Sequence, residues 1–61
     1  MALSASDVDI EQQKAAGRTA AIQASATEHK TTGQTSPDQH PFTYWWVVGY
    51  NEAIDQGLTQ S

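Results

Sequence analysis

The chain has 61 residues and no cysteine, which limits it to one domain and excludes disulfides, cysteine–zinc sites and thiol redox chemistry. Its net charge of −4, with only three Lys and Arg residues, disfavours direct binding to DNA or RNA, which depends on cationic contacts to phosphates. A domain of this size is marginally stable, so we expect tight helix packing, self-association or a protein partner to complete it.

No segment has the character of a secretory signal or a membrane span. Residues 1–7 lack a basic region followed by an apolar one, and the longest apolar run, Tyr44–Val48, is too short to cross a bilayer. A cytoplasmic location without a membrane partner is therefore expected.

The first predicted helix covers about residues 6–28. Ser6 is expected to cap its amino end, and Asp7 and Asp9 lie in the first turn, where the helix dipole favours negative charge. Strong helix formers follow, with alanine recurring as far as Ala26. The pattern is typical of an exposed or amphipathic helix.

Two apolar stripes run along this predicted helix. Val8, Ala15 and Ile22 repeat every seven residues on one side, and Gly17 and Ala21 lie on the opposite side. The second stripe is made of small residues, which permit close approach by another helix. We expect one stripe to pack within the chain, while the other either faces a second subunit or is solvated.

A polar linker at residues 29–41 precedes the second predicted helix, which covers about residues 42–57. Pro41 suits a helix start, and Gly57 suits the position just past a helix end. A strand at Thr43–Val48 is the alternative, because β-formers are frequent there, but it would lack a partner strand. We therefore expect an all-α fold, a two-helix hairpin with a polar linker, which self-association could complete. The sequence shows no internal repeat.

Aromatic residues are concentrated in the second predicted helix, too many for one helical face to bury. Trp and Tyr are enriched at the energetic centres of protein interfaces, so the residues left over are candidates for binding a partner. The alternative is that they complete a core within the chain or in a homodimer. The predicted packing residues are Val8, Ala15, Gly17, Ala21, Ile22, Phe42, Trp46, Gly49, Tyr50 and Ala53, and the predicted partner-binding residues of this helix are Tyr44, Trp45, Val48 and Glu52.

No arrangement of residues indicates catalysis. The chain has no Gly-rich phosphate loop, and Asp7 and Asp9 are two positions apart, which turns them to different sides of a helix. His29 and His40 are the only histidines, so neither a metal nor a cofactor is expected. We therefore expect a protein without enzymatic activity.

The pattern Ala16–Ala21, Pro41-Phe42 and Trp46–Ala53 resembles the ribosome modulation factor family. The resemblance implies two helices joined by a linker, and a protein that binds the small ribosomal subunit near the messenger RNA path and promotes inactive ribosome dimers. Arg18 is the one basic residue that lies within the matching pattern. The resemblance therefore adds Arg18 to the predicted partner-binding residues. The family is strongly basic, whereas this chain has no Lys or Arg after Lys30, which puts the ribosomal RNA surface in doubt.

Three functions follow as expectations. The first is a regulator or inhibitor of a partner protein, of the kind that phages and mobile elements encode. The second is a ribosome-associated, hibernation-type modulation factor, and the third is a structural subunit of a larger assembly. A protein partner is expected in the first, and the acidic charge disfavours the second.

Overall fold

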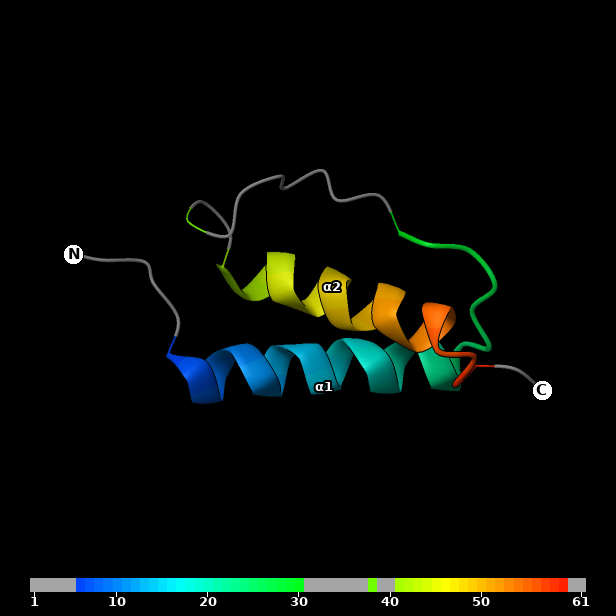
Figure 1. Cartoon of the computed structure of the whole chain (residues 1–61), viewed down its shortest axis with the longest axis horizontal. Coiled ribbons are helices and arrows are strands. Elements are labelled where there is room, and N and C mark those ends of the chain that lie inside the picture. Colours follow the sequence, from blue (N-terminus) through cyan, green and yellow to red (C-terminus); the bar gives the residue numbers. More distant parts are fainter. Residues whose placement is uncertain (1–5, 31–37, 39–40, 60–61) are drawn as a thin grey trace.

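The computed structural model describes residues 6–30, 38 and 41–59, and these residues form two packed helices. Helix α1 spans Asp7–Gln23 and helix α2 spans Pro41–Asp55, joined by a connector of residues 24–40 (Figure 1). No strand occurs in the described part of the chain. The expected all-α hairpin of two helices with a polar linker is confirmed, and the strand alternative for the second segment is wrong.

The amino end of α1 is held by the residue that the sequence indicates. Ser6 has an extended backbone, with φ −71° and ψ 166°, and its hydroxyl accepts a hydrogen bond of 3.2 Å from the Asp9 N–H. This bond satisfies one of the free N–H groups of the first turn. Asp7 and Asp9 lie in that turn, close to the positive end of the helix dipole.

Helix α1 ends at Gln23, earlier than the residue 28 expected from its alanine content. Ser25 adopts a positive φ of 51°, and its N–H donates to the Ile22 carbonyl at 3.1 Å. The Ala26 N–H donates to the Ala21 carbonyl at 3.0 Å. These two bonds form a Schellman motif, which satisfies the last carbonyls and turns the chain away from the helix axis.

Helix α2 begins at Pro41 and ends with the same motif. Gly57 has a φ of 74° and donates to the Ile54 carbonyl at 3.1 Å, and Leu58 donates to the Ala53 carbonyl at 2.9 Å. The sequence placed the end of this helix near Gly57, and the last helical residue is Asp55.

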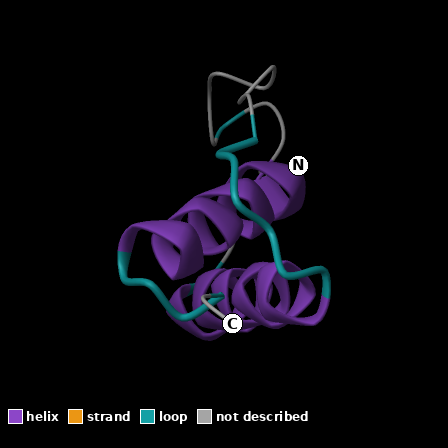
Figure 2. Ribbon diagram, turned by 90° about the vertical axis from the view of Figure 1, so that its right-hand side faces the viewer, coloured by secondary structure: helices purple, strands orange, loops and turns teal. Residues whose placement is uncertain are grey.

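The two helices lie side by side and point in the same direction (Figure 1). Lys14 lies against Gly49 near the middle of the helices, and Ala26 accepts a hydrogen bond from Thr59 just past their carboxyl ends. Residues in contact therefore follow one another in the same order along both helices, from the amino to the carboxyl end. Figure 2, viewed from this shared carboxyl-terminal end, shows the loops that follow the two helices on opposite sides of the helix pair.

Close approach at the centre depends on two glycines. A Cβ atom at Gly17 would collide with the carbonyl oxygen of Trp46, and one at Gly49 would collide with the carbonyl oxygen of Lys14. Gly17 and Gly49 are 32 positions apart, and so are Lys14 and Trp46. The two contacts are therefore equivalent, and the helices pack about a local pseudo-two-fold axis that runs parallel to them.

The core lies along the carboxyl-terminal halves of the helices. Ala21 and Ala53, again 32 positions apart, are fully buried beside Tyr50. Trp46 is half-buried and stacks on Tyr50, with ring centroids 5.3 Å apart and an angle of 27° between the planes. Of the predicted packing residues, those found in these contacts are Gly17, Ala21, Trp46, Gly49, Tyr50 and Ala53.

Four predicted packing residues lie instead on the surface, so the prediction that they form the core of the chain is wrong. Val8, Ile22 and Phe42 are 65%, 45% and 51% exposed, and Ala15 is exposed as well. Val8, Ala15 and Ile22 share the side of α1 that faces away from Gly17, because a helix turns by about 100° per residue. Phe42 shares a helical face with Trp46 and Gly49, but it lies in the first turn of α2, at the end where the helices diverge (Figure 1).

Candidate functional site

Three charged residues of the two helices form a bridge across the helix contact. Glu52 of α2 accepts a hydrogen bond of 3.0 Å from Arg18 and pairs with Lys14 at 3.6 Å. Lys14 and Arg18 are four residues apart on α1, so both reach one carboxylate. The parallel register thus brings together Arg18 and Glu52, which the sequence predicted as separate partner-binding residues.

The third cation, Lys30, contacts α2 from the connector. Its ammonium group lies 5.1 Å from the centroid of the Tyr50 ring, a cation–π distance. Its backbone N–H donates to the Asn51 side chain at 2.9 Å, and its carbonyl accepts from the Asn51 amide at 3.3 Å. All three Lys and Arg residues of the chain are therefore engaged in contacts between its own elements.

Residues 26–30 of the connector run back along α2. The Thr59 hydroxyl donates to the Ala26 carbonyl at 2.6 Å, and the ring of His29 lies 2.6 Å from the Asp55 carboxylate. Lys30 then pairs with Asn51, one turn further toward the start of α2. The direction of these contacts is opposite to that of α2.

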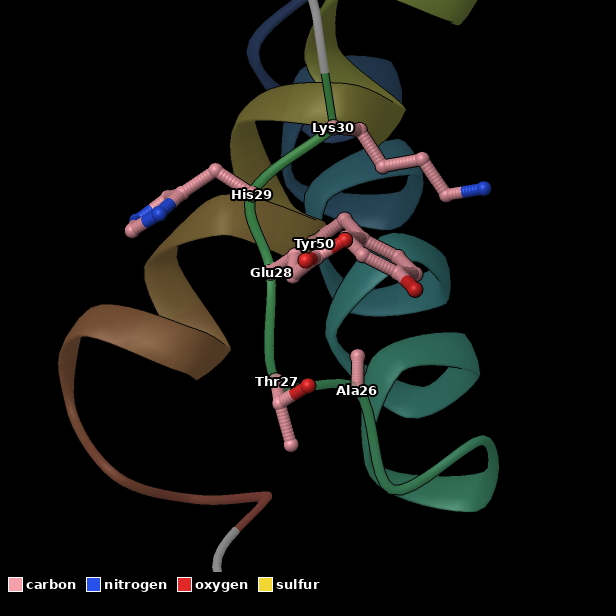
Figure 3. Close-up of a pocket in the computed structure, with 6 residues that line it drawn as sticks. All are labelled: Ala26, Thr27, Glu28, His29, Lys30 and Tyr50. Carbon is pink, nitrogen blue, oxygen red and sulfur yellow. The ribbon is translucent and has the colours of Figure 1, made fainter.

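A pocket of about 250 Å³ lies between this connector segment and α2. Figure 3 shows the side chains of His29 and Lys30 on opposite sides of the extended connector, with the Tyr50 ring on the Lys30 side. The pocket is open, and one cation and one carboxylate are among its lining residues, so it presents no single charge. Its lining consists of Ala26, Thr27, Glu28, His29, Lys30 and Tyr50.

Part of the aromatic cluster is left outside the core. The rings of Tyr44 and Trp45 pack edge to face, with centroids 5.0 Å apart and planes at 88°, and both side chains are partly exposed. Val48, also partly exposed, follows them by four and three residues, so the three side chains are neighbours on the helix surface. We call Tyr44, Trp45 and Val48 the aromatic patch.

Several residues in these contacts are absent from the sequence-based prediction. Val47 is buried and Thr59, which is polar, is buried with its hydroxyl bonded across the two helix ends. Asn51 and His29 hold the connector on α2. One sequence signal was available: Gly-x-x-x-Ala-Ile occurs at residues 17–22 and again at 49–54, where the two helices meet in parallel register.

Groups that could support chemistry are sparse in the described ranges. No three His, Cys, Asp or Glu side chains gather within residues 6–30, 38 and 41–59 in a way that could hold a metal ion. Neither α1 nor α2 has the length and apolarity needed to cross a lipid bilayer.

Comparison with known proteins adds no assignment. The chain matches no protein-family model, no curated protein and no solved structure.

Proposed function

We propose that this chain is a non-enzymatic interaction protein of the cytoplasm, which regulates or inhibits a protein partner that binds the aromatic patch. The observation that carries the proposal is the division of the aromatic cluster. Tyr50 is buried and stacks on Trp46, which packs against the core, whereas Tyr44 and Trp45, half-buried like Trp46, pack on each other outside it. Partly exposed Trp and Tyr side chains supply apolar area and a polar atom at low entropic cost, which suits a binding hot spot.

The charge distribution favours a protein over a nucleic acid as the partner. The chain carries a net charge of −4, and its three basic side chains are engaged with Glu52 or Tyr50. Three cations are few for a phosphate backbone, whose binding depends on many Lys and Arg contacts. A protein surface with basic residues around an apolar centre is the more favourable complement to an acidic chain with an aromatic patch.

Two matched tryptophan substitutions test the proposal. Trp45→Ala removes an aromatic-patch side chain and is expected to weaken binding at least about tenfold while the helical circular dichroism spectrum is retained. Trp46→Ala removes the ring that stacks on Tyr50 and is expected to unfold the chain at lower urea concentration. The measurement is quantitative capture from the native host by wild type and by both variants, with mass spectrometry, alongside urea denaturation.

If wild type and Trp45→Ala captured a partner in equal amounts, the aromatic patch would not be its binding site. Unfolding of both variants to the same extent would place Trp45 in the core instead. Thr43→Ala, an exposed position on the same helix, is the control for nonspecific effects of substitution in α2.

Ribosome-associated modulation of the hibernation type is the second candidate. It is supported by the arrangement of the residues that carry the family resemblance, because Gly17, Trp46, Gly49 and Tyr50 meet at the helix crossing. The engaged basic residues count against it. Co-sedimentation of the chain with ribosomes at low salt, lost steeply as salt is raised, is the expected result, and absence from ribosomal fractions at low salt excludes it.

A further inference from the structure

The outer side of α1 is an open apolar surface. Val8 and Ile22 are 65% and 45% exposed, and Ala15 between them is exposed too. A shallow hollow of about 400 Å³ lies on this side, lined by Asp7, Val8, Glu11, Gln12 and Ala15. Helix α2 packs along the Gly17 side of α1 (Figure 1), and the 100° turn per residue directs the three exposed apolar residues away from it. We call Val8, Ala15 and Ile22 the outer stripe.

The pseudo-two-fold relation between the helices indicates that this is a packing surface. Val47 and Ile54 of α2 are 32 positions after Ala15 and Ile22, so they occupy the equivalent side of α2. There Val47 is buried, and Lys30 of the connector holds both Tyr50 and Asn51, the residues on either side of that stripe. The connector thus packs over α2 where no described segment packs over α1.

We propose that the outer stripe of α1 binds the outer stripe of a second copy of this chain, with the two α1 helices antiparallel. Val8 and Ile22 are each seven residues from Ala15, so a two-fold axis at Ala15 places each Val8 against Ile22 of the second copy. Alanine at the axis lets the helices approach closely. Such a dimer covers on both copies the apolar residues that a single chain leaves in water.

Charge selects the antiparallel orientation. Glu11 and Arg18 are seven residues apart and lie on the same flank of the outer stripe. The two-fold axis brings Glu11 beside Arg18 of the second copy, twice in the dimer. In a parallel pair the flanks that carry Glu11 and Arg18 would lie on opposite sides of the seam, so neither pair could form. Arg18 can serve both contacts, because its bond to Glu52 uses one of the five N–H donors of a guanidinium.

This inference does not depend on the proposed function, because the outer stripe and the aromatic patch are on different helices. Its first test is the dimer dissociation constant measured by sedimentation equilibrium. Ala15→Glu places two carboxylates at the buried axis and is expected to raise that constant at least about tenfold. Ala16→Glu makes the same change at the next residue, which is exposed but outside the stripe, and is expected to change the constant less than about threefold.

Orientation is tested by disulfide trapping, for which the chain is well suited because it has no cysteine of its own. Ala15→Cys is expected to form a covalent dimer under mild oxidation. A mixture of Val8→Cys and Ile22→Cys chains is expected to form the mixed dimer in preference to either homodimer. A parallel dimer would instead link Val8→Cys to itself.

Any of the following results would overturn the proposal. They are a monomer at millimolar concentration, a dimer that Ala15→Glu and Ala16→Glu weaken equally, and a dimer in which Val8→Cys chains link preferentially to one another. Circular dichroism of each variant confirms that the helices persist. The proposal would also be contradicted if the chain were a stable monomer and amide exchange in the outer stripe slowed only when another protein was present. The surface would then bind a different partner.

Discussion

Gly17 of α1 and Gly49 of α2 meet at one crossing, where each lies against the carbonyl group three residues before the other. Gly17 contacts the carbonyl of Trp46, and Gly49 contacts that of Lys14. A shift of one helix along the other would replace a glycine at the crossing with a residue whose Cβ atom has no room against the opposite backbone. The crossing therefore determines the parallel register on which the Arg18–Glu52 bridge depends.

We predict that Gly17→Ala and Gly49→Ala each destabilise the fold by about 2 kcal/mol. Alanine gains about 1 kcal/mol in helix propensity, but the added methyl group must push two backbones apart, and overpacking costs up to about 3 kcal/mol. Urea denaturation followed by circular dichroism measures the difference. Thr19→Ala, at an exposed position of α1, should be neutral or slightly stabilising. If Gly17→Ala behaved like Thr19→Ala, the close crossing would be wrong.

The class of the fold could be predicted from the sequence, but the direction of the helices could not. Local sequence features are enough to indicate two helices. Ser6 caps the first segment, strong helix formers follow it, and apolar residues recur at helical spacing in both segments. A connector of 17 residues can span about 55 Å, and a helix of 17 residues is about 25 Å long, so the chain could return for either orientation. The Gly-x-x-x-Ala-Ile spacing that both helices share is the one feature of the sequence that favours parallel packing.

The candidate site, too, could be predicted from the sequence only in part. Helical geometry alone turns Tyr44 and Val48 away from the face of Trp46 and Tyr50 and places Trp45 to the side, and these three residues are half-buried. That Arg18 pairs with Glu52 depends on the register between helices, which sequence spacing within each helix does not contain. Seven-residue spacing likewise identified Val8, Ala15 and Ile22 as one stripe without deciding whether α2 would pack on it.

The second prediction concerns the ends of the two helices, which share one motif but differ at its central residue. Ser25 and Gly57 both have positive φ, at 51° and 74°, a region that favours glycine. We expect Ser25→Gly to raise the free energy of unfolding by about 0.5–1 kcal/mol and Gly57→Ser to lower it by a similar amount. Thermal and urea denaturation of both variants provide the measurement. A loss of stability in Ser25→Gly would show that the serine side chain contributes more than the strain it carries.

The third prediction concerns the charge bridge. Glu52→Gln removes the partner of both Lys14 and Arg18, and we expect a loss of about 0.5–1 kcal/mol at low salt, small because the three side chains are partly exposed. The loss should shrink in high salt, where such pairs are screened. Glu28→Gln, which removes the same charge from the connector, is the control. Equal effects of the two substitutions would indicate that net charge matters and the bridge does not.

The fourth prediction concerns Thr59, whose buried hydroxyl donates to the Ala26 carbonyl at 2.6 Å and ties the loops that follow the two helices. Thr59→Val keeps the shape of the side chain but leaves that carbonyl without this donor, so we expect a loss of about 1–2 kcal/mol. Because the bond holds the carboxyl-terminal ends together, amide exchange should accelerate most at Ala26 and Leu58. Thr27→Val, an exposed position beside the bond, should leave both rates unchanged. Uniform acceleration throughout α1 and α2 would mean that Thr59 supports the whole fold rather than its carboxyl-terminal end.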